Sequence, residues 1–471
     1  MKKRDQDREI GRRALIKWSL AAGAALGVSR SNICSILEKT AGKGVAMAAG
    51  TLHNKRSVHI RAGNGGLAWF QLMWPHNAIA AAHNTTFAWH KIGQESMAPG
   101  TTKPLTIGPD TAFAAFPGAK QITALMGGTN EQHTDNPTSV VRSVSSGSLF
   151  AIASVLQADT PSVVPVITVD NVDFGTAPGA PQPSNVPTAD DIVGLFNSAA
   201  SRAGGLLATS THADLYRAQY ATLAALNRAS ALSTTRDSYR TSRSAAKFLG
   251  TNLAAQLQFR TGTDDTLYGT SNFTGISNDP GNFSKRDAIT NFAKALAAAA
   301  KAFELGLASS IVLPGMRDDP HGAFGANATL TADSQLVLTA MKGILDGFMA
   351  DLAARTDSVT GEKLSDGVIL TIEGDTPKTP LVNNTWPDAT PQMSNWMYIL
   401  GGGSLKTGWY GGIGTDGNAS GFDPATGATT TAYNGDIQAQ AGVGAVVYAI
   451  TRGDIRRTQD FTRQDFTGII V

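Results

Sequence analysis

The stretch RDAITNFAKALAAAAKAFELGLASSIVL, residues 286–313, decides the fold class. Its first part is rich in Ala and other strong helix formers, so it predicts a helix over 286–306. A short apolar run at 309–313 then predicts a buried strand. The same order follows again, with a helical pattern over 331–355 and an apolar run at 367–372. This alternation indicates an α/β fold with a mostly parallel central sheet and helices on both of its faces.

Further elements of this sheet are expected on both sides of that stretch. Residues 170–187 are rich in proline and predict a loop. The other expected elements are strands at 57–61, 163–169 and 395–400, and helices at 119–126, 137–157 and 436–453.

A helical insertion is expected between the second and third predicted strands. Thr188-Ala189-Asp190-Asp191 resembles a helix-capping sequence, with Asp where Glu is usual. The helical pattern then continues over 189–260. We therefore expect a helical cap at about residues 188–260 within a single α/β domain that spans residues 49–471.

The N-terminus has the features of an export signal. Arg12 and Arg13 are followed by Ala-Leu-Ile-Lys and a short apolar run over 18–28. At about 11 residues this run is shorter than the roughly 20 that span a bilayer. Residues 1–48 are therefore interpreted as a twin-arginine signal peptide and linker, with a cleavage site at Ala46-Met47-Ala48, or as a retained anchor. An amphipathic helix with two chance arginines is the alternative.

This signal implies that the twin-arginine translocase is a partner and that the folded protein is periplasmic or extracellular. Residues 1–48 carry ten Lys and Arg against four Asp and Glu, a net charge of +6. The whole chain carries +2, so residues 49–471 carry −4. This body has no basic excess for binding nucleic acid or an anionic membrane. The single cysteine, Cys34, excludes a disulfide within the chain and a metal centre built from several cysteines.

Acidic and imidazole side chains follow two of the predicted strands. Asp319 and His321 come shortly after the strand at 309–313, and Glu373 and Asp375 come directly after the strand at 367–372. Carboxylates and imidazoles at the carboxyl ends of parallel strands can hold a divalent metal such as zinc, manganese or calcium. If the two strands are neighbours, all four side chains lie together. Turn formation and helix capping are the alternative roles.

An ordered set of motifs carries a family resemblance. The set comprises Asp319-x-His321-Gly322, a long helix, a strand followed by Glu373-x-x-Thr376-Pro377, and Leu400-Gly401-Gly402-Gly403-x-x-Lys406-x-Gly408. This order resembles the uncharacterised twin-arginine-exported, sulfatase-like proteins of the alkaline-phosphatase superfamily. The resemblance covers most of residues 55–455. It implies a metal-dependent hydrolase of phosphate or sulfate esters, with metal ligands at Asp319, His321 and Glu373.

Three departures from the family pattern argue against an intact two-metal site. The glycine turn after the first strand is Asn64-Gly65-Gly66, without the usual carboxylate, and residues 390–395 lack the usual His. The segment from Glu373 to Pro377 lacks the usual Arg. A one-metal site, an unusual site that uses Asn64 and Asp388, and a lost site all remain open.

The sequence is therefore compatible with two functions. The first is a metal-dependent ester hydrolase, and the second is a catalytically degenerate protein that binds or assembles partners at the cell envelope. His133 is a further candidate site residue in a polar loop. Ser139, Ser146 and Ser148 could each supply a nucleophile, and the sequence does not choose among them.

Overall fold

The structure is a computed structural model. It describes residues 53–63, 96–97, 103, 105–107, 122–130, 139–143, 147–160, 162–196, 253–279, 285–315, 332–375, 391–413 and 418–471. These residues all belong to one compact unit of the chain. The expected signal peptide at residues 1–48, with Arg12 and Arg13, lies outside the described residues.

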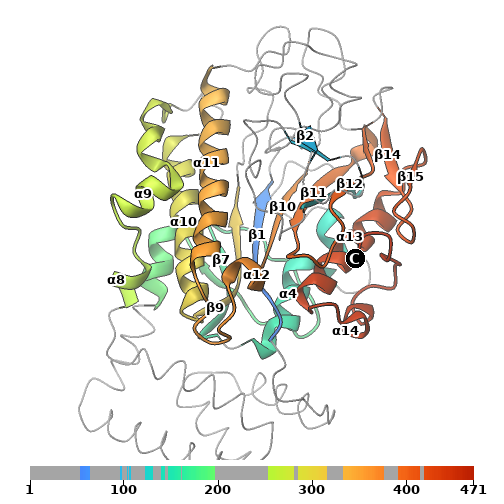
Figure 1. Ribbon diagram of the computed structural model, residues 1–471, viewed down its shortest axis with the longest axis horizontal. Coiled ribbons are helices and arrows are strands. Elements are labelled where there is room, and N and C mark those ends of the chain that lie inside the picture. Colours follow the sequence, from blue (N-terminus) through green and yellow to red (C-terminus); the bar gives the residue numbers. More distant parts are fainter. Residues whose placement is uncertain are drawn as a thin grey trace, which may run out of the picture. The chain divides into compact units, whose positions relative to one another are not determined.

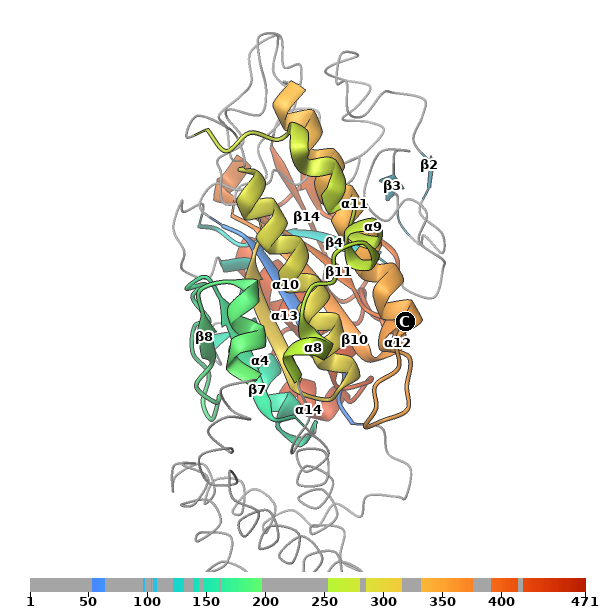
Figure 2. The same cartoon turned by 90° about the vertical axis from the view of Figure 1, so that its left-hand side faces the viewer.

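An eight-stranded sheet forms the centre of the described part (Figures 1 and 2). Seven strands run in one direction and β11 alone runs against them, so the expected mostly parallel sheet is confirmed. In sheet order the strands are β12 (Gly408–Tyr410), β4 (Ile122–Gly127), β11 (Asn395–Leu400), β10 (Val368–Gly374), β1 (Arg56–Ala62), β9 (Ala308–Pro314), β7 (Val164–Val169) and β8 (Ser184–Val186).

Helices cover both faces of this sheet, as the sequence predicts (Figure 1). One face packs against α8 (Leu253–Leu257), α9 (Thr263–Tyr268), α10 (Arg286–Glu304) and α11 (Ala332–Ala354). The other packs against α4 (Leu149–Leu156) and α13 (Gly435–Ile450). Within the described residues no helix combines the length and apolar character of a membrane span.

Smaller elements complete the described part. They are α12 (Leu364–Gly367), α14 (Ile455–Gln459), the 3-10 helices η2 (Ser139–Val141), η3 (Gln157–Asp159), η4 (Thr270–Gly275) and η7 (Pro391–Met393), a small sheet of β13 (Gly412–Ile413), β14 (Ala419–Phe422) and β15 (Thr429–Thr430), and the pairs β2 (Ser96–Met97) with β3 (Thr106–Ile107) and β5 (Arg142–Ser143) with β6 (Gly147–Ser148).

The helix α10 shows why the deciding stretch folds as it does. Its alanines are small and favour helix, so its apolar side can pack closely against the sheet. Near its end, Lys301 is 1% exposed, and its Nζ lies 2.5 Å from Asp264 Oδ2. Gly306 then adopts a positive φ of 71°, a conformation that suits the residue after a helix.

Residues 122–126 do not form the helix expected over 119–126. Residues 122–127 are strand β4, which pairs with β11 on one side and β12 on the other. All six residues are buried, so both faces of the strand lie in the interior and no clear alternation of polar and apolar residues reveals it. A short apolar run of this kind is compatible with either structure until its pairing partners are known. The helix expected over 137–157 is wrong in its first part, because Arg142–Ser143 and Gly147–Ser148 are the short strands β5 and β6 and α4 begins only at Leu149.

The predicted helical cap is described only at its two ends. A helix runs over 189–196 and α8 begins at Leu253, whereas residues 197–252 lie outside the described residues. Its first turn is capped as expected, because the Thr188 backbone N–H and hydroxyl both donate to Asp191 Oδ2. The cap itself stays a prediction.

Candidate functional site

The carboxyl ends of three parallel strands meet at one edge of the sheet. Strand β1 lies between β9 and β10, with Ala62 opposite Gly374 and Arg61 opposite Pro314. The strands that precede Asp319 and Asp375 are therefore not neighbours. The expectation that Asp319, His321, Glu373 and Asp375 lie together required neighbouring strands, and this requirement is not met. The axes of β9 and β10 are about 10 Å apart, because two strand spacings of about 4.8 Å separate them.

Most of the candidate site residues lie outside the described segments. Glu373 and Asp375 are described. The candidates outside the described residues are Asn64, His133, Ser146, Asp319, His321 and Asp388. The turn that contains Asn64 follows β1 and the segment with Asp319 follows β9, so the chain leaves the sheet towards both from the same edge.

Glu373 lies at the end of β10 and makes an ion pair across the sheet. It is opposite Arg61 in the register, and Arg61 Nε lies 3.3 Å from Glu373 Oε1. The two side chains are 2% and 0% exposed. Buried charges need a partner of opposite sign, and each satisfies that need for the other. The pair gives Glu373 a structural role, so its expected role as a metal ligand stays a prediction.

Asp375 is the second buried carboxylate of this edge, and its side chain is 0% exposed. Asn395, the first residue of β11, donates from Nδ2 to the Asp375 backbone carbonyl at 2.7 Å. The same Nδ2 donates to the Asn130 carbonyl at 3.2 Å, just beyond β4. One amide thus fixes the ends of β10 and β4 relative to each other.

Ser139 belongs to the same hydrogen-bond network. Its hydroxyl donates to Asn395 Oδ1 at 3.0 Å and accepts from the Thr129 backbone N–H at 2.6 Å. Its own N–H donates to Asn130 Oδ1 at 2.5 Å. Ser139 is half-buried. Ser148, by contrast, is 4% exposed and caps α4, because its hydroxyl accepts from the Ala151 N–H and donates to the Phe174 carbonyl.

Gly128 allows this close packing. Its φ is 82°, and a Cβ there would lie 2.2 Å from Asn395 Oδ1 and 2.6 Å from Ser139 Oγ. Its carbonyl accepts a 2.6 Å hydrogen bond from the Tyr433 hydroxyl. Burial raises the pKa of Tyr433 strongly, so this hydroxyl keeps its proton and acts as a donor.

His59 lies deeper, in the middle of β1. Its Nδ1 is 2.7 Å from Thr371 Oγ1 on β10, and its ring packs against Phe150 of α4. Complete burial lowers the pKa of His59 from 6.5 to about 3, so the ring is neutral at physiological pH. Its Nε2 has no hydrogen-bond partner among the described residues. A neutral imidazole in the core supports packing and cannot act as an acid near pH 7.

The described part of the site contains no complete metal centre. No group of three or more His, Cys, Asp or Glu in the described segments could hold a metal ion. A centre at this edge needs Asp319 and His321 from beyond β9, and the expected divalent metal therefore stays a prediction.

Sequence reasoning missed the groups that organise the edge. Arg61 lies near the end of β1, where polar and apolar residues alternate over 57–62, and Asn395 is the first residue of the otherwise apolar strand β11. The one available signal was that a charged or amide side chain in a buried strand requires a partner. No protein-family model, curated protein or solved structure matches this chain.

Proposed function

We propose that the chain is an exported, sulfatase-like hydrolase of phosphate or sulfate esters, a divergent member of the alkaline-phosphatase superfamily. The observation that supports this most is the meeting of the carboxyl ends of β9, β1 and β10 at one edge. Sites of open α/β sheets lie at this edge, where loops from separate strands contribute to one centre. Asp375 provides a buried carboxylate there.

A one-metal centre is the form of the site that these residues favour. Asp319 and His321 from beyond β9 and Asp375 from beyond β10 would hold zinc, manganese or calcium, which requires the loop after β9 to reach across the end of β1. Bound there, the cation would supply positive charge to the ester oxygens as negative charge develops on them. Glu373 would take no part as a ligand, because the guanidinium of Arg61 already neutralises it.

Among the candidate hydroxyls that the structure describes, Ser139 fits a reacting role better than Ser148. Ser139 is half-buried at the carboxyl edge and is oriented by Asn395, whereas Ser148 is committed to capping α4. A nucleophile must be reachable by substrate and held in a fixed direction. Ser139 is partly exposed and its hydroxyl is held in a fixed direction, and both features support this role.

A degenerate protein that binds or assembles partners at the envelope is the second candidate. The observation in its favour is the pair of Arg61 and Glu373, in which a protein cation compensates a carboxylate that the resemblance assigns to a metal. The missing carboxylate in the Asn64 turn points the same way. Such a protein would have the same α/β fold and no ester hydrolase activity.

Metal content and esterase activity together separate these candidates. The protein would be purified from the periplasm without chelators, analysed for zinc, manganese and calcium, and assayed with aryl phosphate and aryl sulfate esters. We expect one equivalent of metal in the unaltered protein, and loss of both metal and turnover in Asp375→Asn and His321→Ala. The matched control is Asp346→Asn, a partly exposed carboxylate of α11 that pairs with Lys342.

The outcomes are distinct. Full metal content in Glu373→Gln with loss in Asp375→Asn would support the proposed ligand set. A well-folded protein without metal and without turnover would favour the binding protein. Export is tested separately, since Arg12→Lys together with Arg13→Lys should retain the protein in the cytoplasm. Normal export of that variant would contradict the twin-arginine assignment.

A further inference from the structure

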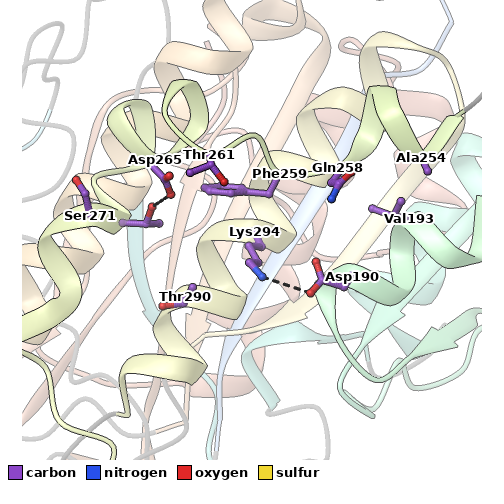
Figure 3. A pocket seen from close by; sticks show the side chains of 11 residues that line it. Asp190, Val193, Ala254, Gln258, Phe259, Thr261, Asp265, Ser271, Thr290 and Lys294 are labelled. Carbon is purple, nitrogen blue, oxygen red and sulfur yellow. Dashed lines mark hydrogen bonds and ion pairs between the residues drawn. The ribbon is translucent and has the colours of Figure 1, made fainter.

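A cavity lies among the helices that cover one face of the sheet, and it is separate from the carboxyl-edge network. It has a volume of about 650 Å³ and is bounded by the helix at 189–196, the segment with α8, α9 and η4, and α10 (Figure 3). Its size is within the range of about 300–1,000 Å³ that is usual for small-molecule sites. It shares no lining residue with the network of Asn395 and Ser139.

Charged groups of both signs line this cavity. Lys294 of α10 reaches towards Asp190, and its Nζ lies 3.3 Å from Asp190 Oδ2 (Figure 3). The two side chains are 34% and 71% exposed, so a dissolved ligand can reach them. An exposed pair of this kind contributes little to stability, which leaves both groups able to exchange partners.

The opposite side of the cavity carries a hydrogen-bond acceptor in a fixed position, Asp265, and an aromatic ring, Phe259. Asp265 Oδ1 accepts from the Thr270 hydroxyl at 2.5 Å, and Oδ2 accepts from the Gly262 N–H at 2.9 Å. These bonds hold the pKa of Asp265 below its usual range, so the carboxylate stays ionised. The half-buried ring of Phe259 also lines the cavity.

We propose that this cavity binds a neutral saccharide. Two carboxylates face one ammonium group, so an anionic ligand would be repelled. An apolar ligand would cover Gln258, Thr290 and Lys294 without giving them hydrogen bonds, which is costly. Sugar hydroxyls both donate and accept, so they match a wall that carries both kinds of group, and the C–H face of a sugar ring can pack on Phe259.

Binding would be measured by calorimetry and by saturation-transfer NMR on the whole protein. The probes are maltose, cellobiose and chitobiose, with glucose 6-phosphate as the anionic comparison. We expect saturable binding of at least one neutral disaccharide and weaker binding of the phosphate. The variants Lys294→Ala and Phe259→Ala should each weaken it by about tenfold, since each removes one principal contact.

The matched control is Lys342→Ala. Lys342 lies on α11 with a side-chain exposure of 29%, and it pairs with Asp346 at 2.9 Å, much as Lys294 pairs with Asp190. Unchanged affinity in this variant supports the proposal. The absence of saturable binding to all three disaccharides would overturn it, and so would an equal loss of affinity in Lys342→Ala or tighter binding of the phosphate. Metal content and esterase activity are independent of these outcomes.

Discussion

The two edges of the central sheet use their charges differently, and strand β1 reaches both. At the amino edge, Arg56 Nε donates to Asp357 Oδ2 at 2.8 Å, and Nη1 donates to the Ala308 carbonyl. Asp357 in turn accepts from the Val359 N–H, which shapes the following turn. The two bonds of Arg56 connect segments that are far apart in the sequence, and the bond of Val359 is local.

At the carboxyl edge the corresponding pair, Arg61 and Glu373, is accompanied by a second buried carboxylate, Asp375, and by a half-buried hydroxyl, Ser139. Stability alone does not require such a concentration of polar groups, because buried polar groups cost free energy unless they are all satisfied. The difference supports the proposal that the carboxyl edge carries the chemistry, whereas the bonds at the amino edge hold the fold together. Each edge can be tested by substitution.

The largest effect is expected at the amino edge, from Arg56→Met. Removing one partner of a buried ion pair leaves Asp357 charged in the interior, which should cost about 3–5 kcal/mol in the free energy of unfolding. Urea denaturation measures this. The control is Arg286→Met, where an exposed Arg lies 3.9 Å from Asp287 and about 0.5 kcal/mol or less is expected. Equal costs for the two variants would show that the buried pair of Arg56 and Asp357 does not stabilise the fold more than an exposed pair does.

The next effect concerns His59, halfway along β1. Its pKa is about 3 in the folded state and near 6.5 when exposed, so between these values the unfolded chain binds one more proton. The stabilising effect of the neutral imidazole is complete above pH 6.5 and is lost as the pH falls, by up to about 1.4 kcal/mol per pH unit.

Unfolding free energies of the parent protein and of His59→Gln, measured between about pH 6 and 4, test this. Glutamine keeps a polar group near Thr371 and does not titrate. The pH slope of the variant should be smaller by roughly one proton. Identical slopes would show that His59 is accessible to water in the folded protein.

At the carboxyl edge, Asn395→Ala should cost about 1–3 kcal/mol, because the Asp375 and Asn130 carbonyls lose their donor. Thermal or urea unfolding reports this loss. If the edge carries chemistry, ester hydrolysis should also fall in samples that remain folded, since Ser139 loses its acceptor. The exposed Asn272→Ala serves as control, and a comparable loss there would mean that the network has no special role.

The smallest effect is expected away from both edges, from Lys294→Ala. The pair with Asp190 is exposed and joins flexible side chains, so the change in unfolding free energy should be about 0.5 kcal/mol or less. Thermal unfolding measures it. A larger loss would show that the pair of Lys294 and Asp190 stabilises the fold, as the pair of Arg56 and Asp357 is expected to do.

Much of the fold follows from local pattern. The helices at 286–304 and 332–354 and the strands at 308–314 and 368–374 lie within a few residues of their expected bounds, because long amphipathic helices and bounded apolar runs are distinctive. The helix expected at 119–126 is strand β4, since a six-residue apolar run has no periodicity of its own.

The candidate site was predictable only in part. The sequence places acids after the right strands, and Glu373 and Asp375 do lie at the carboxyl end of β10. It does not reveal that β1 lies between β9 and β10, or that Arg61 faces Glu373. Both depend on pairing between residues more than 250 positions apart, for which local composition carries no signal.

The sequence by itself determined the α/β class, the alternation of helices and strands and the placement of acidic residues at strand ends, because each is a property of a few neighbouring residues. Tertiary structure alone decided the strand order, the ion pair of Arg61 with Glu373 and the Asn395 network. These arise when long-range pairing brings buried polar groups from distant strands together, and each group must then find a partner in the interior.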